Sequence, residues 1–197
     1  MIIITGWNSR IAVEFRHEVS RMRPFELARR APFDDVPLKA DRYLFCHGLL
    51  RPKRPWEQSL DEVSEGYRAN CTSITEACDR IIAANDHARI CIIGSESAYR
   101  SSFDGVYAAA KADLHGYVEQ VRLRTPEQQI VAISPGIIGD AGMTTRREDI
   151  DNLERRRAEH PKRRFLRSRE VANMAAFLLY EAEFVSNFVV RMHGGLQ

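Results

Sequence analysis

The chain has 197 residues, of which 44% are hydrophobic and 28% are charged. This length suits one domain with a sizeable core, and this composition excludes a disordered chain. The net charge of +2 indicates neither nucleic acid nor a membrane surface as partner, and no apolar run approaches the roughly 20 residues of a membrane helix. Residues 1–6 show no basic segment and no small-residue cleavage site, so we expect no secretion signal, and the four cysteines lack CxxC spacing. We therefore expect a cytoplasmic protein with reduced thiols and no metal site.

The first third of the chain predicts the start of a βαβ unit. Residues 1–5 form an apolar, β-branched run that Gly6 ends, as in a buried strand. Asn8 and Ser9 can cap a helix that continues to about residue 21, with apolar side chains at helical spacing. Three prolines interrupt residues 23–42, where residues 25–28 fit a short strand and no second amphipathic helix follows.

The rest of the chain alternates strands with helices. We predict strands over residues 43–47, 89–95, 129–134 and 188–192, and helices over residues 57–84, 104–122 and 170–180. Residues 140–169 are charged and predicted to be irregular. Such alternation is typical of a parallel sheet covered by helices on both faces, which is a doubly wound α/β domain.

Tyr107 and Lys111 are four residues apart on a predicted helix, so their side chains share one face. A free tyrosine has a pKa near ~10, and a nearby cation lowers that pKa by favouring the phenolate. The pair can thus exchange a proton with an alcohol/carbonyl couple. This spacing also arises by chance, so its surroundings decide its meaning.

Two further features point to the carboxyl edge of the sheet, where open parallel sheets bind ligands. Ser95 ends a predicted strand, and its hydroxyl can either hold a substrate oxygen against Tyr107 or cap the next turn. The turn between the first strand and helix points N–H groups and a helix dipole at a phosphate. Only Gly6 remains there of a glycine-rich pattern, with Arg10 and Ala12 at the other glycine positions.

In order along the chain, these motifs resemble those of the short-chain dehydrogenase/reductase family. The resembling segments are Thr5-Gly6-Trp7-Asn8-Ser9-Arg10-Ile11-Ala12 for the TGxxxGxG turn, Phe45-Cys46-His47-Gly48 for the NNAG strand end, Asn70 for the active-site Asn, Ser95 for the catalytic Ser, Tyr107-Ala108-Ala109-Ala110-Lys111 for YxxxK, and Ser134-Pro135-Gly136-Ile137-Ile138 for the Pro-Gly segment beside the nicotinamide. Residues 170–195 are similar to the family's closing helix and final strand with its Gly-Gly end.

The resemblance implies a Rossmann-type doubly wound parallel sheet in three α/β/α layers, forming a single NAD(P)-binding domain over residues 1–197. It implies a catalytic set in which Tyr107 exchanges the proton, Lys111 lowers the pKa of Tyr107 and holds the nicotinamide ribose, Ser95 orients the substrate oxygen, and Asn70 supports Lys111 through a water. The residues implied for cofactor binding are Thr5, Gly6, Asn8, Ser9, Arg10, Ile11, Arg29, His47, Gly48, Tyr107, Lys111, Pro135, Gly136 and Ile138.

The interval from Gly6 to Gly48 is too short for two further strand–helix units, since each parallel crossover takes a dozen or more residues. We expect at least one such unit to be missing on the adenine side. Arg29 and Arg30 can bind the 2′-phosphate of NADP, which favours NADP slightly over NAD, although a solvated charge run explains both arginines equally well.

The resemblance implies an NAD(P)-dependent oxidoreductase acting on a small alcohol or carbonyl compound. Ten of the 24 residues from 146 to 169 are basic, which indicates either an anionic substrate or simply a solvated lid. The alternative function is a non-catalytic dinucleotide-binding or regulatory protein on the same fold, and the complete Asn-Ser-Tyr-Lys set favours the enzyme. The resemblance also implies a homodimer or homotetramer.

Overall fold

The computed structural model of the chain describes residues 1–100 and 102–196. Its centre is a six-stranded sheet in the order β2-β1-β3-β4-β5-β6, in which every neighbouring pair is parallel. The strands are β1 (Ile2–Thr5), β2 (Ala28–Arg30), β3 (Arg42–Phe45), β4 (Arg89–Ile93), β5 (Gln129–Pro135) and β6 (Phe188–Met192). The predicted doubly wound α/β fold is thus confirmed.

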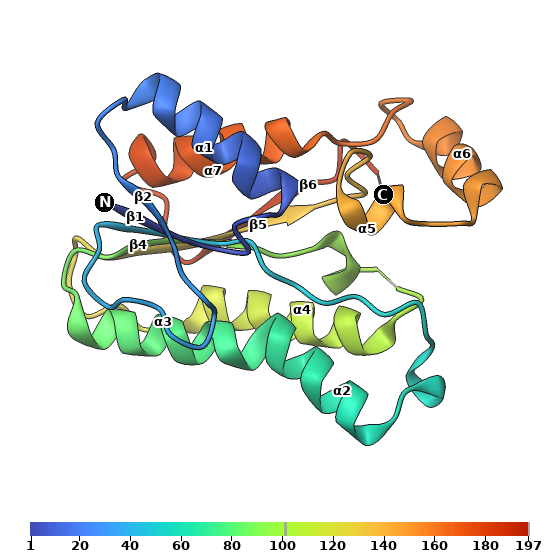
Figure 1. Cartoon of the computed structure of the whole chain (residues 1–197), viewed down its shortest axis with the longest axis horizontal. Coiled ribbons are helices and arrows are strands. Elements are labelled where there is room, and N and C mark those ends of the chain that lie inside the picture. The colour runs from blue at the N-terminus through green and yellow to red at the C-terminus, as the bar shows by residue number, and fades with distance from the viewer. Residues whose placement is uncertain (101, 197) are drawn as a thin grey trace.

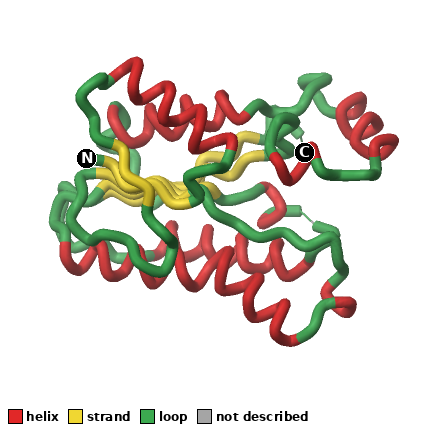
Figure 2. The backbone as a smooth tube through the Cα atoms, viewed as in Figure 1, coloured by secondary structure: helices red, strands yellow, loops and turns green. Residues whose placement is uncertain are grey.

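Helices cover both faces of the sheet and make three layers (Figure 1). On one face lie α1 (Arg10–Met22) and α7 (Ser168–Tyr180), which pack against each other. On the other face lie α2 (Leu60–Tyr67), α3 (Ser73–Ala84) and α4 (Gly105–Gln120). Figure 2 shows the strands as a layer between these two sets of helices.

The alternation of side chains along β1 explains why its three isoleucines are all buried. Ile2 and Ile4 belong to the core cluster formed with α1 and α7, whereas Ile3 belongs to the cluster formed with α3 and α4. Successive residues of a strand point to opposite faces, so a strand buried on both sides must be apolar throughout. The run of isoleucines in the sequence is therefore the signature of a central strand.

The chain forms β1 and then β2 on one side of it, crosses to the other side of β1, and continues there with β3 to β6. This order confirms that a strand–helix unit is missing on the β2 side of the sheet. Residues 31–41 cross from β2 to β3 without a helix. Ala31, Val36 and Ala40 of this crossing enter the core cluster that contains α3, so a loop covers the sheet where a helix would otherwise lie. The short strand itself lies at Ala28–Arg30, later than residues 25–28, and Phe25 is fully exposed.

The helix predicted over residues 57–84 is divided in the structure. Pro55–Glu57 form a separate 3₁₀ turn, and α2 begins at Leu60 because Ser59 and Glu62 form a capping box. A π-helical turn, η2 (Arg68–Thr72), then separates α2 from α3. The turn was not predicted from the sequence, because a π-bulge adds one residue and leaves the apolar periodicity of the helix on each side unchanged.

The segment predicted to be irregular, residues 140–169, contains two helices. These are α5 (Gly142–Thr145) and α6 (Ile150–Glu159), and α6 buries none of its residues. A helix without an apolar stripe leaves no periodic signal, which is why α6 was not predicted. Within residues 1–100 and 102–196, none of the helices combines the length and apolar character that a membrane crossing requires.

Gly6 is expected to be the least replaceable glycine of the sheet edge. Its φ is +62°, and a Cβ at this position would lie 2.6 Å from the carbonyl carbon of Cys46. An alanine at this position would be strained by the positive φ, and its Cβ would clash with the backbone of Cys46, which cannot easily move. Gly6→Ala should therefore lower the free energy of unfolding by about 2–4 kcal/mol. Urea denaturation measures this loss.

Gly116→Ala is the matched control for that substitution. Gly116 lies within α4, and its added Cβ would meet only the end of the flexible Gln120 side chain, at 3.9 Å. Because alanine favours helix, this variant should be as stable as the wild type or more stable. An equal loss in both variants would contradict the account of Gly6.

Candidate active site

The candidate site lies at the carboxyl edge of the sheet. Thr5 ends β1, His47 and Gly48 follow β3, Ser95 follows β4, and Pro135 ends β5. Since all strands run parallel, these four strand ends meet at one edge of the sheet, where residues far apart in sequence can form one site.

Helix α4 carries Tyr107 and Lys111 into the protein interior. Their exposed fractions are 7% and 1%, and the Lys111 ammonium lies 5.9 Å from the centre of the Tyr107 ring. Lys111 Nζ donates a hydrogen bond of 3.0 Å to the carbonyl oxygen of Ile93, at the end of β4. Burial lowers the pKa of Lys111 from 10.5 to about 8. The cation is thus held beside the tyrosine by backbone at a strand end.

Ser95 is within hydrogen-bonding reach of the Tyr107 side chain, and this contact acts to lower the pKa of Tyr107. Burial acts more strongly in the opposite direction, and the pKa of Tyr107 is raised overall. Tyr107 is therefore a neutral phenol at physiological pH in this structure. Ser95 Oγ also accepts a hydrogen bond from Ser97 N at 3.1 Å, so the serine caps η3 (Glu96–Ala98) as well.

Asn70 lies in the π-helical turn η2 and is fully buried. Its Nδ2 donates to the carbonyl oxygens of Leu49 (2.6 Å) and Gly66 (2.8 Å), and its Oδ1 accepts from Leu49 N (3.0 Å). Both amide protons are thus engaged with backbone, and the side chain fixes the path of the chain after β3. A Cβ on Gly48 would lie 3.1 Å from Asn70 Oδ1 and 4.0 Å from Lys111 Nζ, so Gly48 faces both.

The turn between β1 and α1 is closed by its own residues. Ser9 N donates to Gly6 O at 2.8 Å, and Ser9 Oγ caps α1 by accepting from Ala12 N at 3.1 Å. Of the turn residues predicted to bind the cofactor, Asn8 is accessible to solvent, whereas Ile11 packs in the core.

Arg10, at the position of the missing glycine, is engaged with carboxylates. Its guanidinium lies 2.8 Å from Glu14 and 4.0 Å from Asp140, and about half of the side chain is exposed. Asp140 in turn accepts from Ser168 N (2.8 Å) and Ser168 Oγ (3.0 Å) at the start of α7. Arg10 thus links the first helix to the segment after β5.

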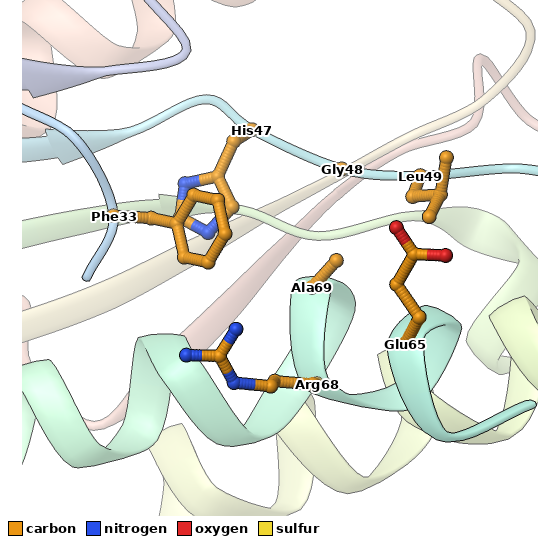
Figure 3. A pocket seen from close by; sticks show the side chains of 7 residues that line it. All are labelled: Phe33, His47, Gly48, Leu49, Glu65, Arg68 and Ala69. Carbon is orange, nitrogen blue, oxygen red and sulfur yellow. The ribbon is translucent and has the colours of Figure 1, made fainter. Parts of the chain in front are cut away.

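His47 is a neutral, tightly packed side chain beside this turn. Its Nδ1 lies 2.7 Å from Thr5 Oγ1, and burial lowers the pKa of the imidazole to about 3. Its ring stacks on Phe33 at 5.1 Å, and Nε2 is buried without a hydrogen-bond partner among the described residues. A shallow hollow of about 260 Å³ opens here, lined by Phe33, His47, Gly48, Leu49, Glu65, Arg68 and Ala69 (Figure 3).

Arg29 and Arg30 are both exposed on the edge strand β2. Arg29 is in register with Ile3 and Arg30 with Ile4, so they project from opposite faces of the strand. The structure therefore does not bring the two guanidinium groups together.

The segment after β5 is tied back to the end of the sheet. Gly136 N donates to Met192 O at 3.1 Å, Ile138 is buried, and Leu166 exchanges backbone hydrogen bonds with Ile137 and Gly139. In the basic stretch that follows, four of the ten basic residues form ion pairs with acids nearby in sequence: Arg147–Asp149, Arg155–Glu159, Arg157–Glu154 and Arg164–Glu170.

Three side chains near the site were not singled out from the sequence. Asp104 caps α4 and could have been found as a capping residue three positions before Tyr107. His115 occupies the space that a side chain on Gly94 would need, and its Nε2 accepts from Ser95 N at 3.4 Å. Glu96 is buried between Ser134 and Arg191. For His115 and Glu96 only tertiary contacts reveal the role.

The comparisons with known proteins agree with this architecture. A family model described as enoyl-(acyl carrier protein) reductase matches residues 39–197. A short-chain dehydrogenase/reductase family oxidoreductase from Burkholderia thailandensis has a TM-score of 0.84 at 17% identity, covering 99% of this chain and 91% of that one. A short-chain dehydrogenase/reductase described as glucose/ribitol dehydrogenase from Brucella melitensis has a TM-score of 0.82 at 18% identity, covering 98% and 95%.

A variant of actinorhodin polyketide ketoreductase, solved with NADPH, has a TM-score of 0.80 at 18% identity, covering 99% of this chain and 96% of that chain. Among curated proteins there is no match. At 17–18% identity, the similarity to solved structures shows only that the fold is shared. The assignment to a family rests on the family model. Because that model covers residues 39–197 and the fold agrees with it, the chain belongs to the short-chain dehydrogenase/reductase family of oxidoreductases.

Proposed function

We propose that the chain is an NAD(P)-dependent oxidoreductase that interconverts an alcohol and a carbonyl group on a small molecule. The observation that carries this proposal is the buried Tyr107–Lys111 pair with Ser95 beside the phenol. A phenol, a cation and a hydroxyl at one strand end are the groups that proton exchange with a substrate oxygen requires.

The residues beside Gly48 fit the nicotinamide half of the cofactor that this family binds. Lys111 Nζ uses one hydrogen bond on Ile93 O, and an ammonium has three donors. Because Gly48 has no side chain, the backbone is uncovered at the point that faces Asn70 and Lys111. Lys111 would hold the ribose hydroxyls there, beside the backbone of Gly48. When bound, the nicotinamide supplies or accepts the hydride.

The protein's part in the reaction is proton transfer and orientation. In the reducing direction Tyr107 donates its proton to the substrate oxygen, and Ser95 holds that oxygen by a hydrogen bond. The raised pKa of Tyr107 keeps the phenol protonated at neutral pH, which suits reduction. Oxidation needs the phenolate, so its rate should increase with pH, with the Lys111 cation favouring that state.

We propose NADP as the preferred cofactor on the shortened adenine side. The end of β2 carries Arg29 and Arg30, and Ala31 rather than an acidic residue follows directly after them, which favours a 2′-phosphate over a free ribose hydroxyl. Because the two arginines project from opposite faces, one of them, rather than both, would meet the phosphate. The helix Ile150–Glu159 buries none of its residues, and four arginines of this basic stretch pair with nearby acids, which together favour a solvated lid over a dedicated site for an anionic substrate.

A carbonyl screen tests the proposed reaction. The purified protein is incubated with NADPH or NADH and a panel of ketones, aldehydes and enones, and loss of cofactor absorbance is followed. Turnover of at least one carbonyl compound, faster with NADPH, is expected. Tight cofactor binding without turnover of any compound would instead support the non-catalytic dinucleotide-binding alternative.

A further inference from the structure

The segment 48–58, which joins β3 to α2, is fixed at both ends by side chains from other elements. Near its start, Asn70 makes two hydrogen bonds with the backbone of Leu49. Further along, Arg51 N donates to Asp104 Oδ2 at 2.9 Å, and Gln58 Nε2 donates to Asp104 Oδ1 at 3.0 Å. Between these points Pro55 packs so closely on Gly105 that a Cβ there would lie 2.7 Å from Pro55 Cγ.

Asp104 also fixes the helix that carries Tyr107. Its Oδ1 accepts a hydrogen bond of 3.0 Å from Tyr107 N, in the first turn of α4. The carboxylate is 97% buried, since its exposed fraction is 3%. Its three partners are uncharged N–H groups, and the helix dipole adds a favourable field at this end.

Helix capping alone does not explain a buried carboxylate at this position. Serine and asparagine cap helices as well as aspartate does, without the cost of burying a charge. Only a carboxylate offers two acceptor oxygens, one for α4 and Gln58 and the other for Arg51. The geometry therefore requires Asp104 as a bridge between the catalytic helix and the segment 48–58.

We propose that Asp104 is a positioning residue that sets the distance between the segment 48–58 and Tyr107. The inference rests on the proposed function, because Gly48 at the start of this segment faces Lys111 and Asn70 where the nicotinamide ribose would bind. Without Asp104 the segment is held near Gly48 by Asn70 alone, so its path beyond Leu49 loosens and Gly48 is less firmly placed. Cofactor binding is then weakened before proton transfer is affected.

Three substitutions at Asp104 separate the two roles. Asp104→Ser keeps a good helix cap at Tyr107 N but cannot reach Arg51, so the KM for NADPH should rise about tenfold while kcat stays within about threefold. Asp104→Asn, which keeps one acceptor oxygen, should behave similarly. Asp104→Ala loses the cap as well, and its kcat should fall by a further factor of about ten.

Ser59→Ala is the control, because it removes the exposed cap of α2 without touching Asp104. It should lower the melting temperature slightly and leave KM and kcat unchanged. A readout independent of turnover is amide hydrogen exchange over residues 49–58. Protection of the Arg51 amide, which donates to Asp104, should be lost in Asp104→Ser and Asp104→Asn and retained in Ser59→Ala, while the Leu49 amide, which donates to Asn70, stays protected in all three.

The outcomes separate this inference from the proposed function. Unchanged exchange in Asp104→Ser overturns the bridge, and lost protection with a KM no higher than in Ser59→Ala overturns its positioning role. If the wild-type protein neither binds nor oxidises NADPH while Asp104→Ser still loses protection, the proposed function fails and the structural bridge stands.

Discussion

Tyr107→Phe is expected to reduce turnover by about 10²–10⁴-fold, the usual contribution of a positioned acid–base group. The substitution removes only the hydroxyl, so the ring should still fill its buried place on α4. Since Tyr107 acts on the substrate oxygen in the proposed mechanism, the dissociation constant for NADPH should change little. Steady-state kinetics and a cofactor titration on the same preparation measure both effects.

Ser95→Ala is the companion variant for Tyr107→Phe. It removes the hydroxyl that contacts the phenol, so it should also reduce kcat strongly while leaving cofactor binding intact. Turnover by Tyr107→Phe at the wild-type rate would contradict the assignment of the proton donor. Equal loss of cofactor binding and turnover would show that the tyrosine serves binding rather than chemistry.

Lys111→Met should separate activity from stability. Loss of the buried cation is expected to reduce kcat/KM by about 10²–10³-fold, as the removal of a preorganised donor does elsewhere. The same substitution should leave the protein as stable as the wild type or stabilise it by up to about 3 kcal/mol at neutral pH. The reason is that burial lowers the pKa of Lys111 to about 8, so the folded state disfavours the charged form.

The pH dependence of that stability difference has a definite sign. The unfolded chain binds the lysine proton more tightly than the folded chain does, so the wild type carries the full cost below about pH 8. The cost disappears as the pH rises from about 8 towards 10.5, and the two proteins should then converge in stability. Urea denaturation across this range tests the prediction, and a Lys111→Met protein that is less stable at pH 7 than at pH 10, relative to wild type, would contradict it.

Much of the fold followed from local sequence patterns, because apolar runs and helical periodicity survive in any tertiary context. The isoleucines of β1, the strand before Ser95 and the spacing of Tyr107 and Lys111 all predicted elements that the structure contains. The short interval from Gly6 to Gly48 correctly indicated a missing strand–helix unit, since chain length limits the number of crossovers.

Other features depend on contacts that no local pattern encodes. The π-helical turn around Asn70 and the solvent-exposed helix α6 lie outside simple periodicity. The stack of His47 on Phe33 requires the loop that replaces a helix between β2 and β3. Likewise, the opposite projection of Arg29 and Arg30 appears only once their register with β1 is known.

The most direct test of the central claim is a fluorescence titration of the wild-type protein with NADPH and NADH, with Lys111→Met alongside. We expect saturable binding of NADPH with a dissociation constant below about 1 mM, weaker binding of NADH, and loss of affinity in Lys111→Met. Absence of saturable binding of either cofactor at millimolar concentration would contradict the claim.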